Sequence, residues 1–543
     1  MADPTVPGPP PPDQARPLGN LALSLSGGGY RAAAFHLGSM RLMDRVGLLP
    51  GVVGLSTVSG GSIVGMAWVV SMLDGKPFSQ FHDEFSRYLV QNNVIAEALE
   101  GLTGDRRGGG QQWASLIRAA ADVYARPNLF GDRRFAEVLG ARGLQLEEAI
   151  FNSTEFHTGR DFRFRRSENA APGLENPNYH LPRSVAMHLR MADIVAASQC
   201  FPGGYEPLVF PQDFRWTPSY PLQSAIDELG PKFKGGLPLM DGGIYDNQGM
   251  ESLLLAFEGT SATTLMISDV SSRVTDIYDV PPNPASRGHV TLKGVERLGF
   301  LLFLLALAAF VVLGWNAVHT ARAGDWGPTD YLLYLVPGLL AAGTAGGLAW
   351  LRHSLKQGFI TLRKTIDTKA WPSLSRLTVP EFTQMMVLRI TSLLALTSGV
   401  FMERIRGLVY GMVASDADFK GRTVRNLIYA LELEDPAFFR EHRWLEPSPG
   451  LVELSQSAQA VPTTLWFTGK DQFDALEACG QATACYVLLR HIVEDRRGQY
   501  EAEGSPLHDL FTRLRAEWEA FNTAPPRPTT PPAAPAAPAT VSL

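Results

Sequence analysis

Cysteine is scarce in this sequence of 543 residues, which contains only Cys200, Cys479 and Cys485. The odd number and the absence of a Cys-x-x-Cys pair argue against a disulfide framework. Each cysteine is therefore expected to be a small buried hydrophobic residue rather than a ligand. This usage indicates a reducing compartment.

A strong excess of charge of either sign is also missing. The formal net charge is −6 and 19% of the residues are charged, which gives no reason to expect nucleic acid as a partner. The N-terminal segment lacks the apolar core of a secretory signal. A Gly-x-x-x-x-Gly-Lys-[Ser/Thr] loop, which would bind a nucleoside triphosphate, is absent.

Proline is abundant at both ends of the chain, in residues 1–18 and 521–543. This composition predicts disordered tails, with a proline-recognising partner as the alternative. Hydrophobic residues make up 45% of the chain. Such a content at this length predicts more than one compact unit between the tails.

Two apolar segments, Leu298–Trp315 and Tyr331–Leu351, contain no charged residue. Each is close to the roughly 20 residues that a helix needs to cross a bilayer. Aromatic residues such as Trp315 and Trp350 lie at the segment ends, where their rings favour the lipid interface. The segments predict a transmembrane hairpin over residues 294–353. The alternative is a buried helical hairpin in a large soluble core.

Basic residues flank this hairpin on its outer sides. They are Lys293, Arg297, Arg352, Lys356, Arg363 and Lys364. The connector also carries Arg322 and His319, but it contains Asp325 and Asp330 as well. Because basic residues favour the cytoplasmic side, we expect a multi-pass membrane protein with both long flanks in the cytoplasm.

The stretch LSTVSGGSIVG, residues 55–65, holds three serines: Ser56, Ser59 and Ser62. Apolar, β-branched residues before Ser59 predict a buried strand, and the residues after it have helical spacing. A nucleophilic serine needs the sharp turn between such a strand and helix, with small neighbours such as Gly61. Ser59 is therefore the candidate, while Ser56 should lie in the strand and Ser62 in the first helical turn.

A glycine-rich loop, Gly27-Gly28-Gly29, follows the predicted strand Leu21–Leu25 and precedes a predicted helix. Three glycines can turn successive N–H groups toward one point at the positive end of a helix dipole. Such a loop binds a phosphate or a developing oxyanion. A dinucleotide fingerprint is formally permitted by Ala32, but no acidic ribose partner stands in a suitable context.

Asp241 ends a third apolar stretch and is followed by Gly242 and Gly243. An aspartate at the carboxyl end of a strand can face the mouth of an open α/β sheet. The alternative is an ordinary Asp-Gly turn at a strand end.

Together these three motifs, in this order, resemble the patatin-like phospholipase family. The motifs are SGGGYR (Ser26–Arg31), TVSGG (Thr57–Gly61) and DGG (Asp241–Gly243). Weaker agreement comes from Phe151–Phe164, Ile194–Leu208 and Thr263–Ser272. One position departs from the family pattern, because Thr57 stands where the family has the first glycine of its Gly-x-Ser-x-Gly turn.

The resemblance implies a patatin-like α/β fold, a three-layer αβα sandwich with a mainly parallel sheet, and a Ser59–Asp241 dyad. Ser59 would attack an ester carbonyl and Asp241 would take up its proton. Gly27, Gly28 and Gly29 would form the oxyanion hole, supported by Arg31, Gly61, Gly242 and Gly243. Arg31 would either attract a lipid phosphate or hold the loop in place, and we favour the second role. No metal or cofactor is implied, and membrane phospholipids or other acyl-ester lipids are the expected substrates.

The resulting domain organisation places a catalytic domain at 19–290 and a helical C-terminal region at 354–520, which completes or flanks it. Two other functions stay open. A Ser–Asp–His esterase would use one of the later histidines, which are His289, His353, His442, His491 and His508. A non-catalytic membrane adaptor would keep the patatin-like shell but has no need of an intact serine, aspartate and glycine loop.

Overall fold

The computed structural model describes residues 16–103, 115–168, 174–273, 290–324, 326–365 and 376–526. Most of both predicted tails and His289 lie outside the described residues. The chain divides into two compact units. One consists of Met1–Ile277 together with Leu396–Leu543, and the other consists of Tyr278–Ala395.

A ten-stranded sheet forms the centre of the first unit, with its main path in the order β10-β9-β1-β2-β3-β4-β5-β6. Five strands run parallel: β1 (Leu21–Leu25), β2 (Val52–Val58), β3 (Glu148–Glu155), β9 (Thr264–Asp269) and β10 (Thr423–Leu427). The others are antiparallel to their neighbours: β4 (Arg160–Ser167), β5 (Leu174–Glu175), β6 (His180–Leu181), β7 (Leu208–Phe210) and β8 (Leu237–Asp241).

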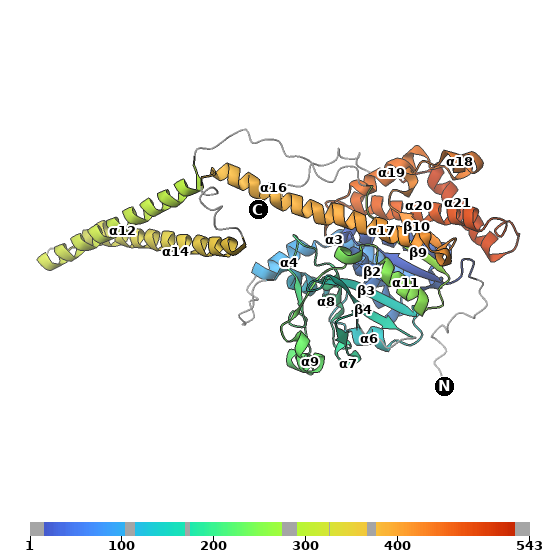
Figure 1. The fold of residues 1–543 in the computed structure, drawn as a ribbon, viewed down its shortest axis with the longest axis horizontal. Helices are drawn as coiled ribbons and strands as arrows, with labels where there is room; N and C mark the ends of the chain where they lie inside the picture. Colours follow the sequence, from blue (N-terminus) through green and yellow to red (C-terminus); the bar gives the residue numbers. More distant parts are fainter. Residues whose placement is uncertain are drawn as a thin grey trace. The chain divides into compact units, whose positions relative to one another are not determined.

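Helices cover both faces of this sheet (Figure 1). Because side chains alternate along a strand, Leu21, Leu23 and Leu25 of β1 face one core and Ala22 faces the other. The larger core contains α1 (Gly29–Arg45), α2 (Gly60–Leu73) and α20 (Lys470–Asp495), and the smaller contains α11 (Met250–Gly259) and α17 (Met402–Ser415). The expected three-layer αβα sandwich is confirmed.

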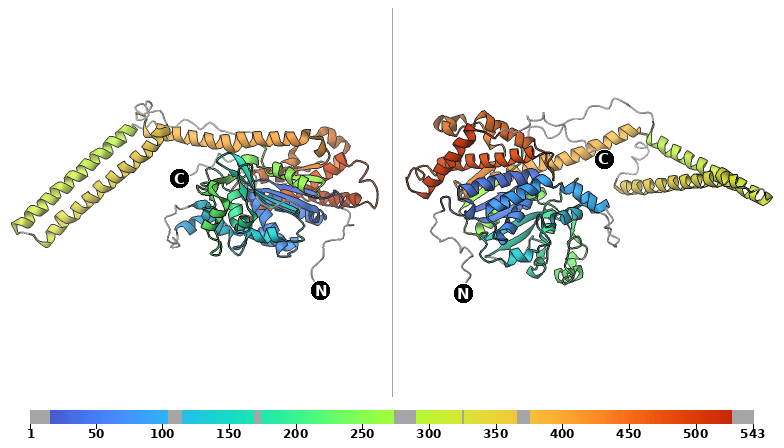
Figure 2. Two further views of the ribbon diagram at one scale, coloured as in Figure 1. Left: turned by 60° about the horizontal axis from the view of Figure 1, so that its bottom comes forward. Right: turned by 180° about the vertical axis from the view of Figure 1, so that it is seen from behind.

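Helices of the C-terminal region belong to this sandwich (Figure 2). Helix α20 crosses α1 at close range. A Cβ on Gly38 would collide with the Glu477 carbonyl, and a Cβ on Gly480 would collide with the Phe35 carbonyl. The C-terminal region also supplies β10, which pairs with β9. The helical pattern of residues 354–520 did not reveal this strand.

The remaining helices of the first unit connect these layers. They are α3 (Phe78–Gln91), α4 (Val94–Thr103), α5 (Leu116–Tyr124), α6 (Phe135–Gly140), α7 (Arg183–Ala186), α8 (Met191–Ser198), α9 (Leu222–Leu229), α10 (Gly243–Asp246), α18 (Pro436–Glu441), α19 (Pro449–Ala460) and α21 (Pro506–Thr523). All three cysteines are buried and unpaired in this unit.

The second unit contains a pair of long helices, α12 (Leu292–Ala323) and α14 (Val336–Thr365). They pack side by side, with the Arg352 guanidinium 4.5 Å from the centre of the Phe300 ring. A short helix, α13 (Pro328–Asp330), and a π-helical turn, η3 (Tyr331–Leu335), join them, and α16 (Val379–Ala395) follows. The two apolar helices expected from the sequence are therefore present.

Three helices among the described residues are long and apolar enough to cross a membrane: Leu292–Ala323, Pro328–Ser354 and Val379–Ser415. The third was not expected. It combines α16, a π-helical turn η4 (Leu396–Phe401) and α17. Charged residues such as Arg389 and Glu403 interrupt its apolar runs, so the sequence contains no uncharged segment of spanning length there.

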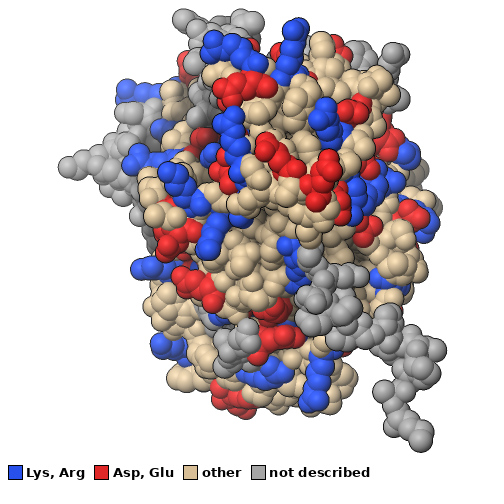
Figure 3. All heavy atoms as spheres, turned by 90° about the vertical axis from the view of Figure 1, so that its right-hand side faces the viewer, with Lys and Arg blue, Asp and Glu red and all other residues tan. Residues whose placement is uncertain are grey.

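Acidic and basic side chains are interspersed over the face of the molecule in Figure 3, which carries no continuous surface of either sign. This distribution agrees with the mild net charge of the sequence.

Candidate functional site

The turn between β2 and α2 holds Ser59 in a strained backbone conformation. Its φ is 49°, and it is the one non-glycine residue with positive φ in the described part of the chain. Such a conformation costs on the order of 1–3 kcal/mol and is found where a site requires it. Ser59 is 8% exposed. The strand–turn–helix predicted around this serine is therefore present.

The two neighbouring serines are fully buried and serve structural hydrogen bonds. Ser56 Oγ donates to the Gly249 carbonyl at 2.8 Å. Ser62 Oγ lies 3.0 Å from Thr57 Oγ1 and 2.8 Å from Ser198 Oγ. Neither hydroxyl lines a cavity with Ser59.

Thr57, which departs from the family pattern, fits the turn without displacing it. Its hydroxyl donates to the Ile150 carbonyl at 3.2 Å and lies against Ser62. Its methyl group occupies the space that a Cβ on Gly65 would need. The glycine in α2 thus accommodates the larger residue in β2.

Glycines bring the two motif loops into direct backbone contact. A Cβ on Gly60 would collide with the Gly29 carbonyl, and one on Gly61 with the Leu25 carbonyl. A Cβ on Gly27 would lie 3.1 Å from the Ser59 Cβ. These close approaches explain why both motifs require glycine, since any side chain would push the loop away from the serine.

The N–H groups of the glycine-rich loop have different partners. Gly27 donates to the Asn247 carbonyl at 3.0 Å, and Tyr30 donates to the Thr464 carbonyl at 2.8 Å. Within the described residues, the N–H groups of Gly28 and Gly29 have no hydrogen-bond partner. The expected oxyanion donor Gly27 is thus already engaged, and its contribution is close packing against Ser59.

Asp241 ends β8, which pairs antiparallel with β3. Ser59 lies close enough to the Asp241 carboxyl to lower its pKa, and the Gly243 N–H donates to Asp241 Oδ1 at 2.7 Å. Burial raises the pKa of Asp241 to about 6, against the lowering effect of Ser59 and of the Gly243 N–H. A Cβ on Gly242 would meet the Asn152 carbonyl oxygen at 2.5 Å. The structure thus brings together the predicted serine and aspartate.

A cavity of about 610 Å³ opens at these residues. Its lining combines both motif loops with segments from the C-terminal region. The lining residues include Gly27, Gly28, Gly29, Arg31, Ser59, Asp241, Gln199, Phe201, Tyr205, Asn247, Gly399, Met402, Glu403, Arg406 and Thr463–Trp466. The mixture of apolar walls and a few polar groups is typical of a small-molecule or lipid site.

Arg31 is held against the C-terminal region rather than pointing freely into the cavity. Its Nη1 donates to Ser272 Oγ at 3.0 Å and to the carbonyls of Gln459 and Val461, each at 3.4 Å. Burial lowers the pKa of Arg31 to about 10, although Asp269 opposes this effect. These contacts hold the helix that begins at the glycine-rich loop.

Several supporting residues were not found from the sequence. Ser198 Oγ accepts the Ser59 N–H at 2.9 Å and donates to the Asn152 carbonyl at 2.6 Å. His36 lies under the glycine loop, with Nε2 3.0 Å from the Ser26 carbonyl, and burial lowers its pKa to about 4. Ser198 lies in the segment Ile194–Leu208, which the sequence indicated only through its resemblance to the family. His36 is one of 11 histidines, and nothing local distinguishes it.

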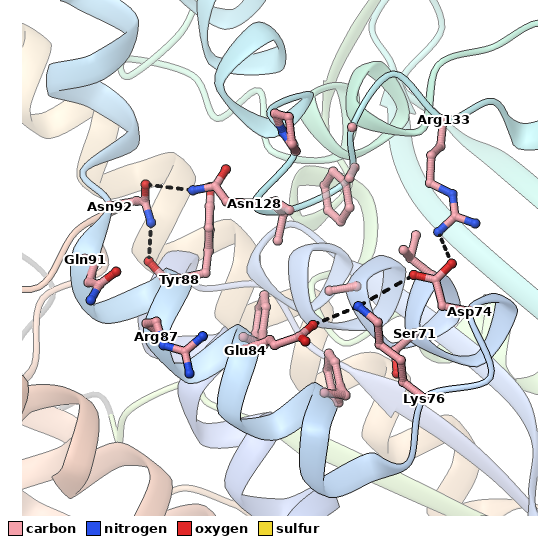
Figure 4. Close-up of a pocket in the computed structure, with 18 residues that line it drawn as sticks. Ser71, Asp74, Lys76, Glu84, Arg87, Tyr88, Gln91, Asn92, Asn128 and Arg133 are labelled. Atoms are coloured by element: carbon pink, nitrogen blue, oxygen red, sulfur yellow. Dashed lines mark hydrogen bonds and ion pairs between the residues drawn. The ribbon is translucent and has the colours of Figure 1, made fainter.

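A second cavity, of about 570 Å³, shares no lining residue with the first (Figure 4). Its charged side chains mostly neutralise one another. Arg133 pairs with Asp74 at 2.8 Å, and Lys76 pairs with Glu84 at 2.8 Å. Its lining includes neither the serine nor the aspartate of the predicted site, so we place the candidate chemistry in the cavity at Ser59.

The fold and this site define an α/β protein in which a strand–turn–helix presents a strained serine beside a buried carboxyl. The family model for Patatin-like phospholipase matches residues 23–254, and this domain belongs to that family. No curated protein matches the chain significantly.

Two solved structures match part of the chain. Human GIVD cytosolic phospholipase A2 is 13% identical with a TM-score of 0.31, and the match covers 46% of this chain and 45% of that chain. The same human enzyme in complex with a methyl gamma-linolenyl fluorophosphonate inhibitor and terbium chloride is 14% identical, with a TM-score of 0.28. That match covers 46% of this chain and 40% of the other. The chain thus spans less than half of each human chain.

Proposed function

We propose that this protein is a membrane-associated acyl hydrolase that cleaves carboxylic esters of phospholipids or other acyl lipids. The observation that carries the proposal is the strained Ser59 beside the buried Asp241, in a cavity that Gly28 and Gly29 also line. Membership of residues 23–254 in the patatin-like phospholipase family supports the same substrate class.

In the first half of the reaction, Ser59 Oγ attacks the ester carbonyl while its proton passes to Asp241. The carbonyl oxygen becomes an oxyanion, and the N–H groups of Gly28 and Gly29 donate to it. One such donor is commonly worth about 10²–10³ in rate. The intermediate then collapses, the ester C–O bond breaks, and the leaving alcohol takes the proton from Asp241.

In the second half, a water molecule attacks the acyl group on Ser59. Asp241 takes one proton from this water, and the same two N–H groups stabilise the second oxyanion. Collapse breaks the bond between the acyl carbon and Ser59 Oγ, which recovers its proton from Asp241. The products are a free carboxylic acid and an unmodified serine. A pKa of about 6 leaves Asp241 mostly ionised at neutral pH and therefore able to act as the base.

The Ser–Asp–His alternative receives no support from the described histidines. None of them lines the cavity at Ser59. His491 lies 2.9 Å from Asp495, and His508 lies 2.9 Å from the Tyr500 carbonyl. A non-catalytic adaptor would need neither a strained Ser59 nor unpaired N–H groups in the glycine-rich loop.

Membrane association rests on the apolar helices. The sheet permits only an even number of crossings, and we assign two of them to α12 and α14, because the apolar runs Leu298–Trp315 and Tyr331–Leu351 contain no charged residue. Strand β9 precedes the three long apolar helices and β10 follows them, yet the two strands pair directly. Both flanks must therefore lie on the same side of the bilayer. The basic residues at the outer ends of α12 and α14 favour the cytoplasmic side.

The test compares wild-type protein with Ser59→Ala, both reconstituted as full chains in phosphatidylcholine vesicles. Release of free fatty acid, followed by mass spectrometry, should be abolished in Ser59→Ala. The matched control is Ser62→Ala, which removes a structural hydroxyl and should retain most activity. A Ser59→Ala protein that releases fatty acid at the wild-type rate would exclude Ser59 as the nucleophile.

A further inference from the structure

One wall of the cavity at Ser59 is a single helix face. Gly399, Met402, Glu403 and Arg406 all line the cavity. Gly399, the adjacent pair Met402 and Glu403, and Arg406 follow one another at intervals of three or four residues, so they lie on one side of the helical segment formed by η4 and α17. This segment is the C-terminal part of the unexpected apolar helix Val379–Ser415.

The other side of the same segment is exposed and mostly apolar, and it also carries the exposed Arg404. Its exposed large hydrophobic residues are Leu396, Val400, Phe401, Leu408 and Met412. Leu408 is 63% exposed and Phe401 is 51% exposed. Clustered exposed residues of this kind mark an interaction surface. We refer to these five residues as the outer face.

Ion pairing holds this segment in the protein. Arg406 is buried, and its Nε donates to Asp269 Oδ2 at 3.0 Å, while its Nη2 donates to the Tyr429 hydroxyl at 2.9 Å. The Tyr410 hydroxyl also donates to Asp269, at 3.1 Å. A helix anchored in this way to the end of β9 is not immersed in lipid on all sides.

The sheet excludes a third crossing in addition to those assigned to α12 and α14. The strands on either side of the three apolar helices, β9 and β10, pair in one sheet. An odd number of crossings would place these two strands on opposite sides of the bilayer. An amphipathic helix that cannot cross can lie in the interface, with its apolar side about 5–10 Å deep among head groups and acyl chains. The outer face has the composition for this placement.

We propose that the outer face of Leu396–Met412 docks on the lipid surface, so that one helix contacts the bilayer on one side and forms the cavity wall on the other. The proposal rests on the proposed function and adds to it a second lipid contact beside Ser59. Lipid is the occupant, because the segment continues an apolar helix of membrane-spanning length and because the cavity that it lines contains Ser59, whose proposed substrates are lipid esters. A lipid molecule leaving the bilayer would pass along this helix to reach the serine.

The first test uses the double variant Phe401→Ser/Leu408→Ser in the full chain. The matched control is Phe156→Ser, which changes a 54% exposed phenylalanine in the β3–β4 turn, outside the cavity lining. Hydrolysis of phosphatidylcholine vesicles should fall by about tenfold or more in the double variant, while hydrolysis of a short soluble ester stays within about twofold. The control should change neither rate.

Equal loss on both substrates would overturn the docking proposal, since the two residues would then support the fold or the chemistry. Unchanged vesicle hydrolysis would overturn it as well. Failure of the proposed function gives a different result, because wild-type protein would then hydrolyse neither substrate.

The second test needs no catalysis. Leu408→Cys, labelled with an environment-sensitive fluorophore, should be quenched in vesicles by lipid carrying a spin label at carbon 5, and less at carbon 12. The three native cysteines are buried and should not react; Phe156→Cys is the control. Stronger quenching at carbon 12 would indicate a crossing, and no quenching would indicate a surface away from lipid. If the label at position 408 is buried against a second copy of the chain in the absence of vesicles, the proposal is also overturned.

Discussion

Replacing Asp241 by asparagine separates the chemical role of this carboxyl group from its structural role. The variant keeps the side-chain volume and one oxygen that can accept the hydrogen bond from the Gly243 N–H. It can no longer take up a proton. Hydrolysis should therefore fall by about 10²–10⁴-fold, and kcat/KM of the wild type should decline as the pH falls below about 6, since Asp241 must be ionised to act as the base.

The same substitution should change stability in a way that depends on pH. Burial raises the pKa of Asp241 from 3.8 to about 6, so the folded chain binds this proton more tightly than the unfolded chain. Ionisation therefore destabilises the fold, beginning as the pH rises above 3.8 and complete above about 6. The difference corresponds to about 3 kcal/mol. At pH 7.5 Asp241→Asn should be more stable than wild type by up to this amount, and near pH 4 the gain should largely vanish.

Urea unfolding, followed by tryptophan fluorescence in one detergent at pH 7.5 and at pH 4, measures this difference. Asp246→Asn is a matched control. Burial also raises the pKa of Asp246 to about 6, but its carboxyl accepts the N–H groups of Gln248 and Glu251 and does not line the cavity. This variant should retain most activity. The reasoning is refuted if Asp241→Asn stays active, or if it is destabilised equally at both pH values.

Three further predictions concern the serine, the glycine contacts and the hairpin. A fluorophosphonate probe should label Ser59, and mass spectrometry that finds the label on Ser62 would reverse the assignment. Gly60→Ala should lose nearly all hydrolysis of a soluble ester, because its Cβ collides with the Gly29 carbonyl; near-normal activity would show that the two loops need not touch. A cysteine at Gly324, between α12 and α14, should react with an impermeant thiol reagent from outside intact cells, and reaction only after lysis would exclude the proposed crossing.

The local sequence was sufficient to predict the elements that carry the site. Apolar β-branched residues before Ser59 and helical spacing after it predict the turn, because one short segment contains the strand, the turn and the helix. The apolar runs at Leu298–Trp315 and Tyr331–Leu351 predict α12 and α14 for the same reason. The glycines are also readable, but only the structure shows that Gly60 touches Gly29 and that Gly27 packs on Ser59.

Long-range pairing was not accessible in this way. Strand β10 lies far from β9 in the chain, and its five residues, between helical segments, gave no signal strong enough to predict a strand. Asp241 was expected at a strand end, but the antiparallel pairing of β8 with β3 depends on contacts with a distant segment. The third apolar helix was not predicted, because charged residues interrupt its apolar runs. Those residues make tertiary contacts such as the Arg406–Asp269 ion pair.

By itself, the sequence determined the candidate serine, the candidate aspartate, the glycine-rich loop and the two uncharged apolar segments, since each depends on residues that are neighbours in the chain. Only the tertiary structure decided which N–H groups of the loop stay unpaired, how strongly burial raises the pKa of Asp241, and which C-terminal helix walls the cavity. These properties depend on distant segments, because desolvation and hydrogen-bond competition are set by whatever folds against a residue. The restriction of the proposed bilayer crossings to an even number has the same origin, since it follows from the pairing of β9 with β10.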